Sequence, residues 1–219
     1  MPVCPICNCE EFKSAPFNRL SRKGLPPVCA NCRSLERHRI GRAIVTKLRD
    51  REKFVEYRLL QLSNDPIVAR GWFASVEYSI YGGDNSIDIQ AIDRPDVSYD
   101  FIVCSHIIEH VPDHRKAIKE LTRVLSLDGL MVLAYPTPAT RAVTVDWGKP
   151  DPAQHGHYRL IGRDFEAEYK TVIPDAFVLS TRGIDPVTGD DDIIYLVTKN
   201  SWWVKRALES GLDCSIVAP

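Results

Sequence analysis

Residues 99–111 read YDFIVCSHIIEHV and residues 119–133 read KELTRVLSLDGLMVL, and these two segments decide the fold. The first segment contains a run of apolar residues, typical of a buried strand, which ends in a polar turn. The second continues a helical pattern and, after Gly129, enters another apolar run. A strand, a helix and a second strand in this order predict two parallel neighbours joined by a helical crossover. This part of the chain therefore indicates an α/β fold.

The same alternation extends along much of the remaining chain. We expect strands at residues 57–63, 75–80, 86–89, 99–105, 130–134, 177–181 and 193–198. We expect helices at residues 67–73, 113–125 and 164–169. This pattern predicts a mostly parallel seven-stranded sheet, covered by helices on both faces and ending in an antiparallel strand pair. Ligands in such sheets bind beyond the carboxyl ends of the strands.

Composition narrows the classes of protein. The 219 residues, 44% of them apolar, suit one domain with a small appendage. The sequence has no apolar run near the roughly 20 residues that a membrane helix needs. Its first residues, MPVCP, lack the basic start and apolar centre of a signal peptide. We therefore expect a cytoplasmic protein without a membrane partner, and the sequence carries no indication of its oligomeric state.

Two cysteine pairs near the start of the chain predict a zinc site. They read CPIC at 4–7 and CANC at 29–32, which is the spacing of a tetrahedral four-thiolate site with ligands Cys4, Cys7, Cys29 and Cys32. Disulfides are the alternative, and a cytoplasmic chain disfavours them. The metal would replace a core that so short a segment cannot build. We expect a structural zinc module at 1–33, a linking helix at 34–55 with Ser34 as its N-cap, and the main domain at 56–219.

The charge of the chain is unevenly distributed. Residues 1–53 carry a net charge of +7 and residues 54–219 carry −8. This predicts either docking of the two parts on each other or an acidic partner for the first part, such as nucleic acid. Arg19, Arg22 and Lys23 lie between the cysteine pairs and could contact phosphates, but few aromatic residues accompany them. A small-molecule substrate is therefore the first expectation and nucleic acid the weaker one.

From Tyr99 to Pro136 the chain resembles the class I S-adenosylmethionine (SAM)-dependent methyltransferases. The residues that carry this resemblance are an Asp-led apolar strand, Glu-His-Val at 109–111, ELTRVL at 120–125 and Asp-Gly at 128–129. Residues 29–39 and 155–165 resemble a zinc-ribbon-bearing subgroup of the same family. The resemblance implies a Rossmann-like methyltransferase fold and a reaction that moves a methyl group from SAM to an acceptor.

The resemblance also implies a cofactor site, and there the sequence departs from the family. The loop after the first strand, LQLSNDP at 60–66, has no glycine, whereas the family's glycines let the backbone approach the cofactor. Pro66 still suits the first turn of a helix. The residues that would bind the cofactor are Ser63, Asn64 and Asp65 in the loop, Glu77 on the second strand, Asp88 and Gln90 after the third, and Ser105 at the end of the fourth.

Histidines follow the decisive strand. His106 to His110 spell His-x-x-Glu-His, as in a class of zinc proteases, but that mechanism needs both histidines on one helix and here they follow a strand directly. At the end of the central strand, His106 or His110 could remove a proton from an acceptor. The long loop 137–158 would shape the acceptor pocket with His155, His157 and Tyr158.

Two hypotheses follow from these patterns. The first is a SAM-dependent methyltransferase that acts on a small metabolite or another acceptor. The second is a non-methylating descendant of the fold that has lost the SAM loop. It would be a binding or regulatory module, or an enzyme whose histidines, together with Glu109, hold a second metal ion. In the family, the second strand normally ends in an acidic residue that binds the ribose hydroxyls, and Glu77 is a poor match for that position. The glycine-free loop and this departure motivate the second hypothesis.

Overall fold

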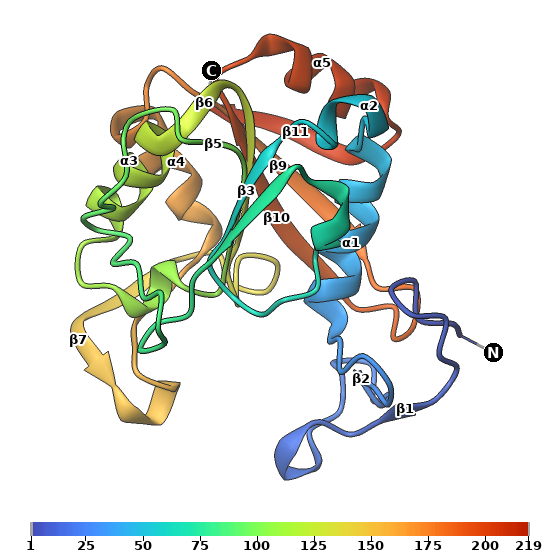
Figure 1. Cartoon of the computed structure of the whole chain (residues 1–219). Helices are drawn as coiled ribbons and strands as arrows, with labels where there is room; N and C mark the ends of the chain where they lie inside the picture. Colours follow the sequence, from blue (N-terminus) through green and yellow to red (C-terminus); the bar gives the residue numbers. More distant parts are fainter. Residues whose placement is uncertain (1, 219) are drawn as a thin grey trace.

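A seven-stranded sheet forms the centre of the molecule (Figure 1). The structure is a computed structural model that describes residues 2–218, apart from the side chains of residues 51 and 52. The strands of the sheet are β3 (Arg58–Gln61), β4 (Ser75–Tyr78), β5 (Tyr99–Ser105), β6 (Leu125–Ala134), β9 (Phe177–Ile184), β10 (Asp191–Thr198) and β11 (Asp213–Ala218). Their order across the sheet is β11-β9-β10-β6-β5-β3-β4.

The sheet is mixed, with a block of four parallel strands followed by the antiparallel ending that the sequence predicts. Strands β4, β3, β5 and β6 run parallel to one another, whereas the contacts of β10 with β6 and β9, and of β9 with β11, are antiparallel. The predicted number of seven strands is confirmed, but one predicted strand does not form and an unpredicted strand takes its place in the count. Residues 86–89 form no strand, and β11 adds a strand at the opposite edge.

Side-chain hydrogen bonds explain why residues 86–89 are irregular. The Ser79 hydroxyl accepts from the Ile87 N–H at 2.9 Å, and the Ser86 hydroxyl accepts from the Gly82 N–H at 3.0 Å. These bonds use backbone donors that a strand would give to its neighbour. The segment therefore closes as a loop at the β4 edge.

Helices cover both faces of the sheet, as the sequence predicts. On one face lie α1 (Glu36–Leu48), α2 (Arg51–Phe54) and α5 (Ser201–Glu209), and on the other α3 (His114–Val124) and α4 (Glu166–Val172) (Figure 1). Short 3-10 helices are η1 (Pro16–Asn18), η2 (Arg70–Trp72), η3 (Ile108–His110), η4 (Pro152–Gln154) and η5 (Arg163–Phe165). No helix within residues 2–218 has the length and apolar character needed to cross a membrane.

The helix predicted at 67–73 is wrong, since only the turn η2 forms there. The Arg42 guanidinium on α1 donates to the carbonyl oxygens of Pro66 and Ile67, both at 2.9 Å. Those carbonyls would otherwise accept the first hydrogen bonds of the helix. A residue distant in sequence thus replaces the local structure that the Pro66 signal indicates.

Each face of the sheet has its own core. Along β5, Phe101 and Val103 pack beneath α1 and α5, while Ile102 and Cys104 pack beneath α3 and α4. This burial on both sides is why the strand reads as a continuous apolar run instead of an alternating one. Helix α1 approaches β9 closely, because a Cβ on Gly183 would stand 2.4 Å from a methyl carbon of Ile40.

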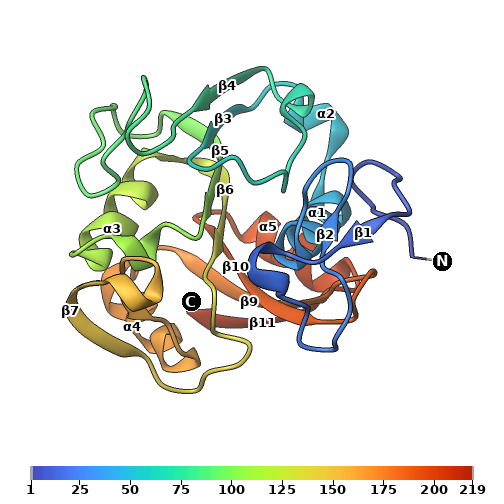
Figure 2. The ribbon, with the colours of Figure 1, turned by 90° about the horizontal axis from the view of Figure 1, so that it is seen from below.

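The cysteine module and a β-hairpin lie at the same end of the sheet (Figures 1 and 2). The module contains the two short antiparallel strands β1 (Phe12–Lys13) and β2 (Val28–Cys29), and the hairpin contains β7 (Val145–Asp151) and β8 (His157–Leu160). Arg39 of α1 anchors the module. Its guanidinium donates to the carbonyls of Pro27 and Ser34 and forms a two-pronged, fully buried ion pair with Asp185, with both N–O distances at 2.7 Å.

Candidate functional site

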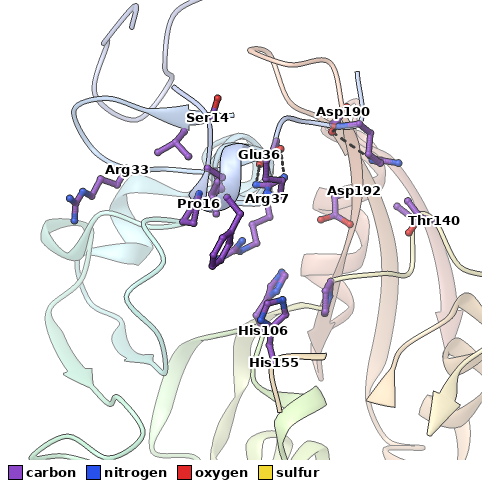
Figure 3. Close-up of a pocket in the computed structure, with 18 of the residues that line it drawn as sticks. Ser14, Pro16, Arg33, Glu36, Arg37, His106, Thr140, His155, Asp190 and Asp192 are labelled. Carbon is purple, nitrogen blue, oxygen red and sulfur yellow. Dashed lines mark hydrogen bonds and ion pairs between the residues drawn. The ribbon is translucent and has the colours of Figure 1, made fainter. Parts of the chain in front are cut away.

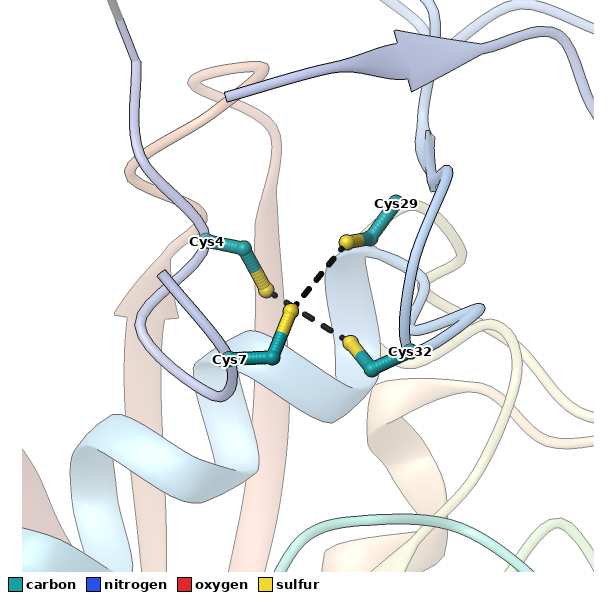
Figure 4. Close-up of side chains that lie close together, drawn as sticks. All are labelled: Cys4, Cys7, Cys29 and Cys32. Carbon is teal, nitrogen blue, oxygen red and sulfur yellow. Dashed lines mark hydrogen bonds between the residues drawn. The ribbon is translucent and has the colours of Figure 1, made fainter. Parts of the chain in front are cut away.

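The four cysteines of the module converge on one point (Figure 4). The Sγ atoms of Cys4 and Cys32 are 3.7 Å apart, those of Cys7 and Cys29 are 3.5 Å apart, and all four lie within 4.8 Å of one another. A zinc ion with bonds of about 2.3 Å to four thiolates needs Sγ–Sγ distances of about 3.8 Å. All seven cysteines are free thiols. The donor set therefore fits a structural zinc ion and not a pair of disulfides.

Ser34 is part of this cluster and does not cap α1. Its hydroxyl lies 3.2 Å from the Sγ of Cys32 and 3.4 Å from that of Cys4. The N-cap of α1 is Leu35, whose N–H donates to Nδ1 of His38 at 3.1 Å. The predicted cap at Ser34 is wrong because the sulfur atoms bind its hydroxyl group instead.

A cavity of about 1090 Å³ separates the cysteine module from the end of the sheet (Figure 3). One wall is formed by residues 13–19 and by Arg37 of α1, and the other by Asp190, Asp191 and Asp192 at the start of β10. Residues that follow β5 and β6, together with the β7–β8 hairpin, complete the lining. This is the end of the sheet where ligands of α/β proteins bind.

Most charges near the cavity are paired, but one carboxyl group is not neutralised by a direct ion pair. The Arg22 N–H and guanidinium bind Asp190 and Asp191, and Arg19 binds Glu36 at 3.3 Å. The Asp192 carboxylate accepts from the N–H of the next residue at 2.8 Å. Burial raises the pKa of Asp192 to about 7, in spite of that hydrogen bond and of the more distant arginine charges. Asp192 therefore presents a titratable group to whatever enters the cavity.

His106 stands directly at the end of β5 in a strained conformation. Its φ angle is +55°, which is uncommon for a residue with a side chain. Its N–H donates to the Ala134 carbonyl at 2.9 Å, joining the ends of β5 and β6. Burial and the charge of Arg37 lower the pKa of His106 to about 3, so the imidazole is neutral near pH 7. Its Nε2 is buried without a hydrogen-bond partner, so it can bind a ligand in the cavity.

Glu109, His110 and His157 form a second cluster of potential ligands. One ligand atom from each of them lies within 4.8 Å of the other two. The rings of His110 and His157 meet edge to face with centroids 4.5 Å apart. Burial raises the pKa of Glu109 to about 8, and burial together with the neighbouring histidines lowers the pKa of His157 to about 4.

The remaining predicted acceptor-site residues separate into two groups. His155 lines the large cavity together with His106 and His157, and its ring centroid is 6.0 Å from that of His157. Tyr158 does not line the cavity, because successive side chains along β8 point to opposite faces and His157 faces the cavity. The Tyr158 ring centroid lies 5.8 Å from the Arg159 guanidinium carbon. The structure thus places three of the predicted histidines at the cavity and Tyr158 away from it.

Asp65, one of the carboxylates predicted to bind the cofactor, has partners within the chain. Asp65 accepts from the Ser105 hydroxyl at 2.6 Å and lies 2.8 Å from Nε2 of His38 and 3.7 Å from the Arg37 guanidinium. Burial by itself would raise the pKa of Asp65. The interactions with His38, Arg37 and Ser105 outweigh burial and hold this pKa well below its usual range. Asp65 therefore ties α1 to the ends of β3 and β5.

Glu77 and the loop after β4 are also engaged. The Glu77 carboxylate binds the Arg94 guanidinium at 2.5 Å and the Tyr99 hydroxyl. Asp88 accepts from the Gln90 N–H at 2.9 Å, and the Gln90 side chain accepts from the N–H of Asp113 at 2.9 Å. None of the predicted cofactor-binding residues lines the large cavity.

Three buried polar atoms at the ends of β3 and β4 have no hydrogen-bond partner among the residues that the structure describes. They are Oε1 of Gln61, Oγ of Ser63 and the hydroxyl of Tyr78. Gln61 and Tyr78 are paired across the two strands, so their side chains project from the same face of the sheet. Among them only Ser63 belongs to the predicted set. A polar glutamine in an apolar strand is the signal that could have identified Gln61.

Comparisons with known proteins agree with this architecture. The family model described as a methyltransferase domain matches residues 20–167. No curated protein matches the chain.

Solved structures give a measure of the likeness. An N1-methyltransferase from Burkholderia thailandensis, solved with 1,6-didemethyltoxoflavin and S-adenosylhomocysteine (SAH), has a TM-score of 0.51 and 12% identity, covering 73% of this chain and 76% of its own. The YcgJ protein from Bacillus subtilis has a TM-score of 0.40 and 17% identity, covering 78% and 77%. The trans-methyltransferase CalH, in complex with SAH, has a TM-score of 0.35 and 12% identity, covering 44% of this chain and 38% of its own. The chain thus covers well under two thirds of the length of CalH. The similarity to the N1-methyltransferase from Burkholderia thailandensis shows a shared fold.

Proposed function

The chain belongs to the methyltransferase-domain family, and we propose that it transfers a methyl group from SAM to a polar small molecule. The observation that carries this proposal is the cavity at the carboxyl ends of β5 and β6, with the neutral imidazole of His106 on its lining. The methyltransferase from Burkholderia thailandensis was solved with both an acceptor and SAH, which supports a site for two ligands in a fold of this kind.

The cofactor would supply an electrophilic methyl group on its sulfonium centre. Within this chain, Gln61, Ser63 and Tyr78 fit as its partners, because their buried polar atoms are unsatisfied at the ends of β3 and β4. Asp65 and Glu77 fit less well, because each already has partners within the chain. The chain would thus hold the cofactor mainly through neutral hydrogen-bonding groups in place of the usual glycine loop and acidic residue.

The acceptor would be positioned by the cavity wall. Methyl transfer requires an acceptor atom aligned with the methyl group, so alignment is the larger part of catalysis. The free Nε2 of His106 can accept a hydrogen bond from an acceptor hydroxyl or amine. A pKa of about 3 makes His106 a weak proton acceptor. Its proposed role is therefore mainly to orient the acceptor.

The charges of the cavity indicate the chemistry of the acceptor. Arg37 contributes a cation on one wall and Asp192 a carboxyl group on the other. An acceptor with an acidic group could bind Arg37 on one wall. If it also carries a basic or hydroxyl group, that group could bind Asp192 on the other wall. Because the cysteine module builds one wall, its zinc ion would support acceptor binding as well as folding. This enclosure between two walls favours a small molecule over nucleic acid.

Calorimetric titration of the full chain with SAM and with SAH tests the proposal. Binding of either ligand is expected, and replacement of Gln61 by leucine should weaken it about tenfold, the value of a hydrogen bond to a charged group. Gln154→Leu in the β7–β8 hairpin makes the same chemical change away from β3 and should leave binding unchanged. Absence of binding by both ligands at high micromolar concentration would refute the proposal.

A further inference from the structure

The cluster of Glu109, His110 and His157 has the composition of a metal site. Two imidazoles and one carboxylate place their ligand atoms within 4.8 Å of one another. Glu109 and His110 come from η3, the turn after β5, and His157 comes from β8, which lies far along the chain. Two histidines with one carboxylate form a common three-ligand set for divalent transition metals in enzymes.

Burial provides a second and independent indication. The Glu109 side chain is 0% exposed, and within the described residues neither of its carboxylate oxygens has a hydrogen-bond partner. Nδ1 of His106 lies 3.7 Å from Oε1 of Glu109, beyond hydrogen-bond distance. Nδ1 of His157 is also buried without a partner. A buried carboxyl group is almost always satisfied by a donor, a water molecule or a cation. These unpartnered oxygen and nitrogen atoms belong to the residues whose ligand atoms converge. One metal ion between them would therefore give the buried polar atoms an electrostatic partner.

The hairpin that brings His157 to this cluster is firmly held. Arg159, two residues further along β8, is 2% exposed. Its guanidinium donates to the carbonyls of Ile108, Val111 and Pro112 around η3, at 3.2, 2.6 and 2.8 Å. It also binds Asp146 of β7 at 2.8 Å. Because Arg159 and His157 project from the same face of β8, the contacts that fix Arg159 also fix His157 against Glu109.

We propose that Glu109, His110 and His157 bind a divalent transition-metal ion, in a site separate from the cysteine cluster. Imidazole ligands favour an ion such as Zn²⁺, Co²⁺ or Fe²⁺ over Mg²⁺ or Ca²⁺, which prefer oxygen ligands throughout. His110 is exposed, so the ion has a route from solvent. Three protein ligands leave at least one coordination position for another molecule.

The position of this site indicates what the ion would do. His157 belongs to the metal-ligand cluster and also lines the large cavity. An ion held by His157 is therefore within reach of a molecule in the cavity, whose oxygen or nitrogen atom could occupy the open position. Coordination would hold that atom in place and acidify its proton. This role of the ion rests on the proposed methyl transfer, whereas binding of the ion does not.

Cobalt titration of the full chain, with the cysteine site already loaded with zinc, tests the site. The wild type is expected to take one further equivalent of Co²⁺, measured by calorimetry. Its absorption spectrum should lack the thiolate-to-cobalt charge transfer that marks binding to cysteines. Glu109→Gln and His110→Ala should each weaken cobalt binding by about 10–100-fold or more. Replacement of residues that only hydrogen-bond to metal ligands already causes losses of this size.

A matched variant separates ligand loss from general effects. His114→Gln also removes one histidine, but His114 pairs with Glu168 at 3.1 Å outside the cluster, so this variant should keep the additional equivalent. His110 is exposed and its replacement should leave the thermal transition unchanged. The proposal is overturned if the wild type binds no additional cobalt, or if both ligand variants bind it as the wild type does. SAH titration remains a separate measurement, so failure of the metal site and failure of the proposed function can be distinguished.

Discussion

Replacement of Asp185 by asparagine should strongly destabilise the chain. Four hydrogen bonds converge on the two oxygens of this buried carboxylate. Two come from the Arg39 guanidinium at 2.7 Å, and two from the Thr188 N–H and hydroxyl at 3.0 and 2.7 Å. Asparagine offers one acceptor oxygen, and its amide group would place a donor against another donor. It would also leave the Arg39 charge buried without its counter-ion, since the side chains of both residues are 0% exposed.

The expected magnitude follows from that burial. Breaking a buried ion pair by removing one partner costs about 3–5 kcal/mol. For a chain of this length such a loss lowers Tm by between about 6 and 20 °C. Urea unfolding and differential scanning calorimetry would measure both quantities. Asp96→Asn is the matched control, because Asp96 pairs with Arg123 at 2.6 Å but its side chain is 73% exposed. That exposed pair should contribute at most about 1 kcal/mol.

A double replacement distinguishes the cause of the loss. Arg39→Met combined with Asp185→Leu removes both charges and should recover a large part of the stability lost in Asp185→Asn. The reasoning is refuted if Asp185→Asn costs no more than Asp96→Asn. The recovery should be partial, because the carbonyls of Pro27 and Ser34 also lose their donor in the double replacement.

Three further predictions concern the cysteine module and the cavity. Removal of the proposed zinc ion by a strong chelator should lower the Tm of the chain, since an ion bound by the four cysteines would take the place of a core in the module, and calorimetry with and without the chelator measures this. The raised pKa of Asp192 gives a stability contribution that is fully present below about pH 4 and is lost as the pH rises to about 7. Asp192→Asn should therefore gain stability over the wild type across that range, by less than about 1.4 kcal/mol per pH unit in urea unfolding, and a constant difference would contradict this. His106→Asn should fold normally, because asparagine tolerates a positive φ, whereas His106→Leu should be less stable than His106→Asn, because leucine rarely adopts that conformation. In assays of methyl transfer His106→Asn should lose about tenfold in kcat/KM, and a loss of about 10³-fold or more would instead indicate a general base.

Local patterns predicted the centre of the fold well. The apolar run at 99–105 is β5, and the helix predicted at 113–125 is α3, which begins at His114 because Asp113 accepts from the Lys116 N–H. The two cysteine pairs likewise predicted their own convergence, since each pair brings two thiols to one side of a short turn. Such features depend on residues a few positions apart, which is why a single sequence reveals them.

Predictions failed where a distant residue competes with a local signal. Pro66 indicates a helix, but Arg42 from α1 takes the carbonyls that would begin it. Asp65 and Glu77 are well placed for a cofactor by sequence, yet His38 and Arg94 already bind them. These partners lie 27 and 17 positions away, and charge alone does not reveal which arginine or histidine meets which carboxylate.

The sequence by itself determined the fold class, the resemblance to methyltransferases and the four cysteines that converge. Apolar periodicity and ligand spacing are properties of short segments, so these conclusions needed no coordinates. Only the tertiary structure decided that the cysteine module forms one wall of a cavity, and that His157 meets Glu109 and His110. Those contacts depend on the buried pair of Arg39 with Asp185 and on Arg159 binding the turn after β5. Each such bond joins segments whose relative placement is set by packing of the whole chain.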